Sequence, residues 1–374
     1  MPVTDGKRLI ENRVEAIKSF HADAGIPKAE LDLSGGIDSA VMAYLLVKAL
    51  GPENVILVHT RIDTNPKQTD RATELGKGLE CPAAVLDLTD IFRTLADNAV
   101  KAAADRLGSG PWYGGPGLKG PDARELEVIQ QRVESDPTIL GSLRSTLRAP
   151  VGRFFNRLFG GGVRYGTGNE CEDRFLRFFQ KGGDGEVDTN PIEMLSKTEV
   201  FQLAFAIAEA EKGTPLEKCF RELITVKPSP DLWGQGDAHN DEDELKSWTG
   251  VEFTYGRVDP ETGKVLSFGT IERVARLLDV DADTPETIMP YALALFTAET
   301  PSEVQVAYDL GLGLSRQFGI FPADTFADEQ VLNFLKATRK AERRTRHKSN
   351  TNIPTLGTRA ELVDAEILSD KLEA

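Results

Sequence analysis

The amino-acid sequence predicts an α/β fold in which a parallel sheet is flanked by helices. Three short segments in the first 100 residues are predicted to be strands: 29–34, 54–60 and 83–88, of which 54–60 is a β-branched apolar run typical of a buried strand. Helical segments separate them or follow them: 38–50, 68–79 and about 90–106. Strands that alternate with helices favour parallel pairing, because a crossover between parallel strands is usually a helix.

The rest of the chain is expected to add one strand and many helices. Gly- and Pro-rich residues 107–122 predict a loop or insertion. A helix is predicted at 139–158, interrupted at Pro150 because proline breaks the backbone hydrogen-bond ladder. A fourth strand is expected at about 162–166, and a helix begins near Asn169. Further helices are predicted at 193–212, 269–279, 286–297, 300–311 and 325–345, with a turn at 256–264.

Composition excludes several classes of protein. The 374 residues are 40% hydrophobic and 28% charged, and no apolar run is long enough to span a membrane. The net charge of −15 argues against general binding to nucleic acid. Cys81, Cys171 and Cys219 are few, odd in number and far apart, so neither a disulfide framework nor a four-cysteine zinc site is expected. A cytoplasmic location fits this cysteine usage and the absence of an apolar leader.

The sharpest local pattern is the segment 34–39, SGGIDS, between a predicted strand and a predicted helix. Gly35 and Gly36 allow a tight turn that points successive backbone N–H groups at one anion. The helix that follows adds its positive N-terminal end, and Ser34 and Ser39 supply hydroxyl donors. The segment therefore predicts a phosphate-binding loop.

Asp38 is unexpected in an anion site unless a cation shares that site. A carboxylate that holds Mg²⁺ bound to the phosphates resolves the conflict. The loop lacks the lysine of a Walker A motif. It resembles the SGGxDS loop of the PP-loop ATP pyrophosphatases, which cleave ATP between the α and β phosphates. That resemblance implies a Rossmann-like parallel sheet and ATP as a substrate.

Four further segments and the C-terminal tail resemble the ammonia-dependent NAD synthetases, in the same order along the chain. Residues 166–172, GTGNECE, are similar to the segment in which a Thr or Ser contacts ATP and a Glu binds Mg²⁺. The resemblance assigns these roles to Thr167 and Glu172. Asp38 and Glu172 would then share one Mg²⁺ ion.

The other matching segments carry the remaining candidate residues. Residues 179–185, FQKGGDG, resemble the segment whose Lys and Asp bind the dinucleotide, here Lys181 and Asp184. Residues 195–200 resemble L-x-K-T-x-V, which places Lys197 on the ATP phosphates. Residues 227–232 with 241–245 resemble a segment whose Ser or Thr, here Ser229, touches ATP. The tail 347–354 loosely resembles one that closes over the substrate, with His347 and Lys348.

Several positions depart from the family pattern, mostly on the side of the acceptor substrate. Gln180 and Gly182 replace a Thr and a Tyr, and Thr146 replaces the first of two arginines, leaving Arg148 as a substrate ligand. An extra residue between Glu172 and Lys181 rotates a helical face by about 100°. Asp173 is therefore an alternative to Glu172 as the second metal ligand, although Glu172 keeps its spacing from Thr167.

The resemblance implies an AMP-forming ligase of NAD biosynthesis. ATP would adenylylate nicotinic acid adenine dinucleotide, and ammonia would displace AMP. The chain has no room for a glutamine amidase domain. The resemblance also implies a homodimer, and the helix at 139–158 is the candidate contact. We expect a catalytic domain at 1–255, with an insertion at about 107–138, and a mainly helical extension at 256–374, which includes a closing tail at about 343–356.

Other interpretations remain open at this point. The enzyme could be a PP-loop amide ligase for a different carboxylate, because the changes fall on the acceptor side. A tRNA-thiolating enzyme would need a basic surface and paired cysteines, and a non-catalytic nucleotide-binding protein would not need Ser34, Asp38 and Lys197. The acidic run 241–244 is most simply a solvated loop, and the basic run 336–348 a solvated helix face or a phosphate-binding lid. His59 is expected to be a structural histidine.

Overall fold

A four-stranded parallel sheet lies at the centre of the amino-terminal part of the chain. The computed structural model describes residues 3–109, 123–229, 240–278, 291–345, 348 and 359–368. The strands are β1 (Ala29–Asp32), β2 (Val55–Arg61), β3 (Ala84–Asp87) and β4 (Val163–Tyr165). Their order in the sheet is β3-β2-β1-β4. All the pairs are parallel, and Leu31 lies between Leu57 and Tyr165. The predicted α/β fold and its four strands are confirmed.

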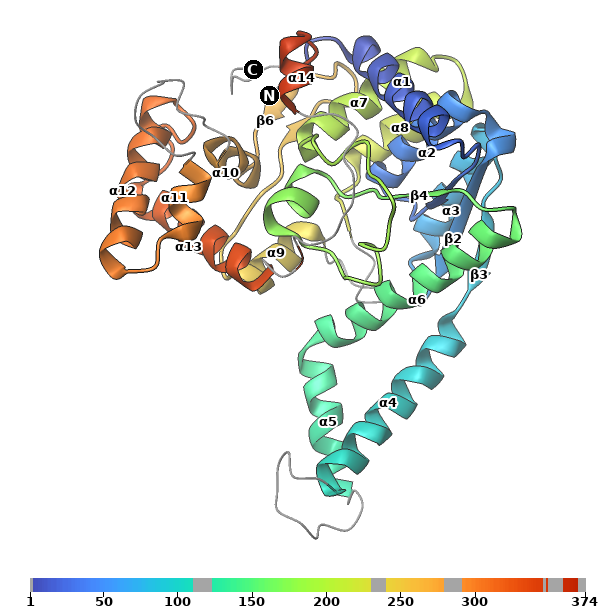
Figure 1. Cartoon of the computed structure of the whole chain (residues 1–374), viewed down its shortest axis with the longest axis horizontal. Helices are drawn as coiled ribbons and strands as arrows, with labels where there is room; N and C mark the ends of the chain where they lie inside the picture. The colour runs from blue at the N-terminus through green and yellow to red at the C-terminus, as the bar shows by residue number, and fades with distance from the viewer. Residues whose placement is uncertain are drawn as a thin grey trace.

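Helices cover both faces of this sheet. One layer, visible in Figure 1, contains α1 (Gly6–Ala24), α2 (Ile37–Leu50), α7 (Lys197–Ala210) and α8 (Pro215–Thr225), with α3 (Pro66–Gly78) beside it. Its apolar side chains form the largest buried cluster together with those of the strands. A short 3₁₀ turn (Pro52–Asn54) leads into β2. On the other side α6 (Pro137–Leu158) packs on β1 and β2, and it shares a smaller cluster with Phe92.

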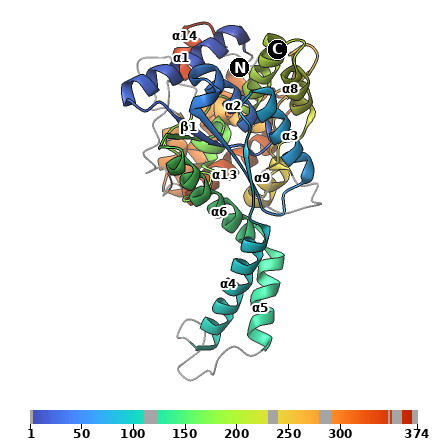
Figure 2. The same ribbon diagram turned by 90° about the vertical axis from the view of Figure 1, so that its right-hand side faces the viewer.

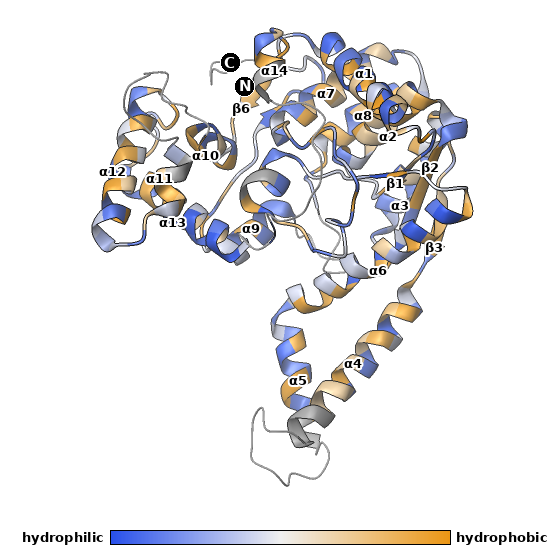
Figure 3. Cartoon of the chain, in the orientation of Figure 1, coloured by the Kyte–Doolittle hydropathy of each residue, from blue (hydrophilic) through white to orange (hydrophobic). Residues whose placement is uncertain are grey.

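A helical hairpin projects from the sheet (Figures 1 and 2). It consists of α4 (Thr89–Ser109) and α5 (Ala123–Ser135), which pack on each other and lead into α6. Figure 3 shows apolar and polar residues interspersed along both helices, as expected for helices that bury one side. Where the structure describes the insertion predicted at 107–138, it is mainly helical, and α4 already includes residues 107–109, which the Gly- and Pro-rich pattern had placed in a loop.

The carboxyl-terminal half builds a second buried cluster. Its elements are α9 (Asp241–Thr249), the hairpin β5 (Arg257–Val258) and β6 (Val265–Ser267), α10 (Thr270–Leu278), α11 (Tyr291–Thr297), α12 (Pro301–Gln317) and α13 (Asp328–Thr345). The apolar side chains of these helices pack with Cys171 and Leu176 of a π-helix, η2 (Glu170–Leu176), whereas Val258 and Val265 of the hairpin pack into the first cluster. The helices expected beyond residue 268 are confirmed where the structure describes them, and the predicted turn is the tip of a β-hairpin.

The last described helix returns to the first cluster. Leu362 of α14 (Arg359–Asp364), together with Ile367 and Leu368, packs into the main core. Val3 and Leu368 form an antiparallel bridge, and Thr4 N donates to Ile367 O (3.2 Å). Among the described helices, none is long and apolar enough to cross a bilayer.

Three predicted elements need correction. Pro150 lies inside α6 without ending it, so the expected interruption is wrong. The helix expected at 193–212 begins only at Lys197, because Ser196 caps it through a bond from Glu199 N. The helix after Asn169 is a π-helix, whose wider turn is rare and often found at functional sites.

Candidate active site

The predicted phosphate loop connects β1 to α2 and opens into a cavity of about 210 Å³. The hydroxyls of Ser34 and Ser39 share a hydrogen bond of 2.9 Å, and Ser39 Oγ donates to Gly36 O (3.1 Å). Gly36 N donates to Ser34 Oγ (3.2 Å), so the loop is closed by its own contacts. The N-terminal end of α2 is directed at the cavity, and this arrangement suits an anion.

Gly35 cannot be replaced without strain. Its φ is +84°, and a Cβ there would lie 2.2 Å from Gln68 O. The backbone of α3 therefore packs directly against the loop, and Arg71 Nε donates to Gly35 O (3.1 Å). Gly35 shapes the loop from behind, whereas its neighbour Gly36 lines the cavity.

We expect Gly35→Ala to lower the free energy of unfolding by about 2 to 4 kcal/mol, because it adds left-handed strain and a backbone clash. Gly36→Ala is the matched control, since its Cβ would meet only Ser34 Oγ at 3.3 Å and its φ is −93°. Chemical denaturation of both variants measures the difference. Equal stabilities would show that the loop accommodates a side chain at residue 35.

The side chain of Lys197 lies at the centre of the charged groups in this cavity. Its Nζ donates to Asp38 Oδ2 (2.7 Å), and it lies 3.1 Å from Glu172 Oε1 and 3.7 Å from Asp241 Oδ2. Burial alone would lower the pKa of Lys197, but these three carboxylates raise it well above its ordinary value. Lys197 is therefore a permanent cation at the N-terminal end of α7.

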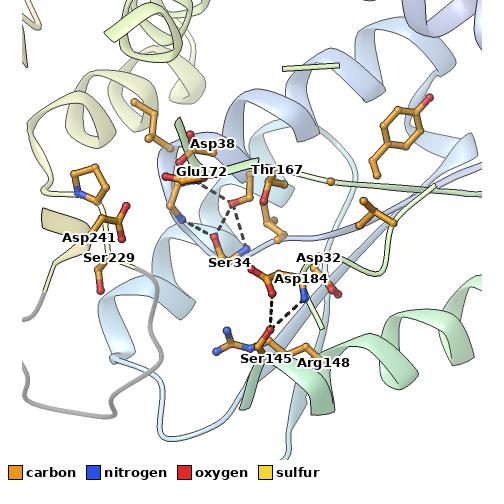
Figure 4. A pocket seen from close by; sticks show the side chains of 18 of the residues that line it. Asp32, Ser34, Asp38, Ser145, Arg148, Thr167, Glu172, Asp184, Ser229 and Asp241 are labelled. Atoms are coloured by element: carbon orange, nitrogen blue, oxygen red, sulfur yellow. Dashed lines mark hydrogen bonds between the residues drawn. The ribbon is translucent and has the colours of Figure 1, made fainter. Parts of the chain in front are cut away.

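Asp38 and Glu172 face the cavity from two different elements (Figure 4). Asp38 is in the first turn of α2, and its Oδ1 is buried with no hydrogen-bond partner among the described residues. Glu172 is in η2, where Tyr255 Oη donates to its Oε1 (3.3 Å). Asp173, the alternative ligand, is directed elsewhere and accepts from Asn190 Nδ2 (2.9 Å). The geometry thus brings Glu172, not Asp173, to Asp38.

Five carboxylates and three cationic side chains line the cavity: Asp32, Asp38, Glu172, Asp184 and Asp241 against Arg148, Arg164 and Lys197. Such a site repels a polyphosphate unless a metal ion accompanies it. Within the described residues, no three His, Cys, Asp or Glu side chains are grouped as metal ligands. Two carboxylates that share an ion with phosphate oxygens remain compatible with this, since Mg²⁺ is usually held by few protein ligands.

The candidate residues for the acceptor substrate lie on α6 and the segment after η2. Arg148 and Asp184 line the cavity, and Ser145 Oγ donates to Asp184 Oδ1 (2.7 Å) (Figure 4). Thr167 and Ser229 line it as well. Lys181 is exposed and does not line the cavity. Thr146 is also exposed, so the arginine missing at this position is lost from the outer side of α6.

Lys348 lies close to the segment that carries Lys181 and Asp184. Its Nζ donates to Arg177 O (3.0 Å) and to Phe179 O. Burial lowers the pKa of Lys348, and Asp184 opposes this effect. His347 and Pro354 lie outside the described residues. The described part of the predicted tail thus touches the candidate substrate segment through one lysine.

The sequence interpretation missed Asp241. Residues 241–244 are the first turn of α9, not a solvated loop, and Asn240 caps this helix. Burial raises the pKa of Asp241 to about 7, and Lys197 opposes this shift. An asparagine directly before an acidic run is a helix-start signal that could have indicated the helix. Its burial against Lys197 is a tertiary contact that no local pattern shows. His59, expected to be structural, bonds to Leu33 O (2.7 Å) and Thr69 Oγ1 (2.9 Å).

Glu244 is a second buried carboxylate of α9, and its Oε2 has no hydrogen-bond partner among the described residues. Burial and the nearby carboxylates of Asp241 and Asp184 raise its pKa from 4.5 to about 8. A raised pKa in the folded state means that this group's contribution to stability is complete below pH 4.5. The contribution falls as the pH rises through 8.

We therefore expect Glu244→Gln to make stability less dependent on pH. Between pH 5 and pH 9 the variant should gain on the order of 3 kcal/mol over the parent protein, because glutamine never ionises. Thermal unfolding across this pH range provides the measurement. Glu74→Gln, an exposed change on α3, should leave the profile as it is. If the stability of Glu244→Gln depends on pH in the same way as that of the parent protein, Glu244 ionises without a loss of stability.

Known proteins are similar to this chain over much of its length. A sequence model described as NAD synthase matches residues 9–110 and 130–262. A protein named NH(3)-dependent NAD(+) synthetase from Methanococcoides burtonii is 30% identical over 77% of this chain and 90% of its own length. One of the same name from Archaeoglobus fulgidus is 32% identical over 62% of this chain and 76% of its own. The structure of NMN synthetase from Francisella tularensis aligns with a TM-score of 0.48 and 19% identity, over 84% of this chain and 95% of that one.

Proposed function

Because the chain belongs to the NAD synthase family, we propose that it is an ammonia-dependent NAD synthetase. It would use ATP to convert the nicotinate carboxylate of nicotinic acid adenine dinucleotide into an amide, releasing AMP and pyrophosphate. The observation that carries this proposal is the position of Lys197 among Asp38, Glu172 and Asp241, beside the phosphate loop. This arrangement of charges suits a polyphosphate that arrives with a cation.

The donor set fits Mg²⁺ as the accompanying ion. Asp38 and Glu172 supply hard oxygen ligands from two elements, and the buried Oδ1 of Asp38 lacks a partner among the described residues. When bound, the ion would neutralise charge on the phosphates and on the leaving pyrophosphate. Lys197 and the N–H groups of residues 34–39 would hold the same phosphates. Thr167 and Ser229, which line the cavity, are proposed ATP contacts.

The proposed reaction has two steps. An oxygen of the nicotinate carboxylate attacks the α-phosphorus of ATP, and the bond to the bridging oxygen of the β-phosphate breaks. Ammonia then attacks the acyl carbon, loses a proton, and AMP leaves with the bond electrons. The protein's contribution is to place the two substrates in line and to stabilise the charge that develops on pyrophosphate.

The proposed acceptor contacts surround Asp184. Arg148 and Asp184 lie in the cavity, and Ser145 orients the Asp184 carboxylate. Lys181, His347 and Lys348 remain proposals for the dinucleotide. At the two altered positions, Gln180 N donates to Asp184 Oδ1 (2.8 Å), and Gly182 has open space around it. These two changes therefore leave the Asp184 contact intact.

Three further statements remain predictions. The first is a homodimer in which α6 takes part, and the exposed Phe154 and Leu158 near its end would suit such a contact. The second is a cytoplasmic location. All three cysteines are free thiols in the structure. The division into a catalytic domain at 1–255 and an extension at 256–374 is likewise a proposal.

An assay of the pure protein tests the proposed function. With ATP, Mg²⁺, ammonium and nicotinic acid adenine dinucleotide, we expect NAD, AMP and pyrophosphate in equal amounts, and no NAD when ammonium or Mg²⁺ is omitted. The alternative, an amide ligase for another carboxylate, predicts ATP binding without NAD or AMP under these conditions. Nicotinic acid mononucleotide and free nicotinate are then the first acceptors to compare.

A further inference from the structure

Helix α10 begins beyond residue 262, the last residue that the family model matches, yet it contacts both segments that carry the charged groups of the site. Glu272 and Arg276 of α10 are buried. They lie one helical turn apart and therefore on the same face of the helix. Neither side chain lines the cavity. Glu272 contacts Thr198, which directly follows Lys197. Arg276 contacts Glu170, which lies close to Glu172 in η2.

Glu272 holds the start of α7. Its Oε1 accepts from Thr198 N (2.7 Å) and from Thr198 Oγ1 (2.6 Å), and its Oε2 accepts from Gly269 N (2.8 Å). Thr198 follows Lys197, the first residue of α7. The first N–H groups of a helix have no partner within the helix, and a carboxylate is favoured there by the helix dipole. Glu272 thus fixes the backbone from which the Lys197 side chain extends.

The contact between Glu272 and Thr198 is tightly enclosed. A Cβ at Gly256 would lie 1.9 Å from Thr198 Oγ1 and 2.7 Å from Glu272 Oε2. A Cβ at Gly269 would lie 2.2 Å from Thr254 O. Gly256 lets the chain pass close to the carboxylate, and Gly269 lets it pass close to the backbone of residues 254 and 255. With no exposed surface, Glu272 makes its hydrogen bonds where water does not compete.

Arg276 holds the element that carries Glu172. Its Nη2 forms an ion pair with Glu170 Oε2, and Glu170 is fully buried. Glu170 is the first residue of η2, and its N–H donates to Leu195 O (2.8 Å). A π-helix is rare, and it is found frequently at functional sites. Glu342 of α13 adds a second contact to η2 through Arg177 (3.6 Å).

We infer that α10 sets the distance between Lys197 and Glu172. It does so through two contacts, Glu272 with Thr198 on α7 and Arg276 with Glu170 on η2, which together are called the bracket. Glu272 and Arg276 are positioning residues for the amidation proposed above, and the inference rests on that function. Lys197 Nζ and Glu172 Oε1 are 3.1 Å apart, and loosening either element changes this distance at the phosphate site. A shift of about 1 Å in such a site can cost on the order of a hundredfold in rate.

Glu272→Gln provides the first test. Glutamine keeps one acceptor oxygen for Thr198, but its amide NH₂ faces the N–H donor of Gly269. We expect kcat for NAD formation to fall about tenfold or more, and the KM for the dinucleotide to stay within about threefold. Hydrogen exchange of residues 196–200 should speed up, because the Thr198 N–H reports on this bond directly. Thr198→Val, which removes only the hydroxyl partner, should give a smaller change of the same kind.

Arg273→Met is the matched control. Arg273 lies in α10 next to Glu272, but its Nη1 donates to Ile320 O inside the carboxyl-terminal helices. The control should lower the melting temperature as much as Glu272→Gln does, while kcat and the exchange of 196–200 stay within about threefold of the parent protein. If Glu272→Gln changes only the melting temperature, the bracket is wrong.

Failure of the proposed function can be told apart from failure of this inference. If the parent protein makes no NAD, the acceptor assignment fails, but exchange at 196–200 and the Kd for Mg-ATP still test the bracket. Both should change in Glu272→Gln and not in Arg273→Met. Unchanged exchange and unchanged Kd in Glu272→Gln overturn the inference whatever the acceptor proves to be. Should Glu272→Gln fail to fold, Thr198→Val decides by the same two measurements.

Discussion

Replacing Asp38 with asparagine is expected to lower kcat for NAD formation by at least about a thousandfold. The variant keeps the shape of the side chain but removes a charge from the place where Mg²⁺ and the phosphates would meet. Lys197 retains Glu172 at 3.1 Å, so the fold should persist. Steady-state kinetics over a range of Mg²⁺ concentrations measures the effect, and thermal unfolding verifies that the protein is folded.

Asp173→Asn is the control for this prediction. Burial and the nearby carboxylate of Glu172 raise the pKa of Asp173, and asparagine keeps its shape and an oxygen that can accept from Asn190. Its rate should stay within about threefold of the parent protein, whereas Glu172→Gln should resemble Asp38→Asn. If Asp173→Asn and Glu172→Gln lower the rate of NAD formation equally, Asp173 is again a candidate for the second metal ligand.

The second large effect is expected from Arg164→Met. Arg164 Nη1 donates to both oxygens of Glu30 (2.8 and 2.7 Å), and its Nη2 donates to Asp32, which lines the cavity. Arg164 and Glu30 are 2% and 0% exposed. Removing the cation leaves a buried carboxylate without a counter-charge, so we expect the free energy of unfolding to fall by about 3 to 5 kcal/mol. Chemical denaturation measures the loss.

Arg153→Met on the neighbouring helix is the control. Arg153 makes exposed ion pairs with Glu186 (3.1 Å) and Asp188 (3.7 Å), so its loss should cost less than about 1 kcal/mol. The double variant Glu30→Leu with Arg164→Met should recover part of the stability, because no unpaired charge remains at residue 30. If Arg164→Met costs no more than Arg153→Met, the buried network does not stabilise the fold.

The sequence predicted the strands and the phosphate loop because both are local. The β-branched apolar run at 54–60 is typical of a strand buried on both faces, and the loop at 34–39 connects a strand to a helix wherever it occurs. Each helix from α1 to α3 also begins or ends at a visible signal, such as Asn65 followed by Pro66. These features are determined within a few residues.

What the sequence did not predict depends on distant partners. Asp241 is half-buried and lies 3.7 Å from Lys197 Nζ, a residue far away along the chain. Pro150 remains inside α6, where packing on β1 and β2 outweighs the lost hydrogen bond. Glu272 carries no motif, and only the structure shows that it binds Thr198. Local periodicity does not contain such contacts, since they arise when separate elements pack together.

The return of α14 to the first core has a consequence for synthesis of the chain. Leu362, Ile367 and Leu368 fill part of the same cluster as Leu9 and Ile17, while the carboxyl-terminal helices are made in between. During translation the sheet can therefore assemble early, but its apolar layer stays open at α1 until residue 368 has left the ribosome. The nascent protein exposes this surface longer than its strand order suggests, until residues 362–368 pack on it.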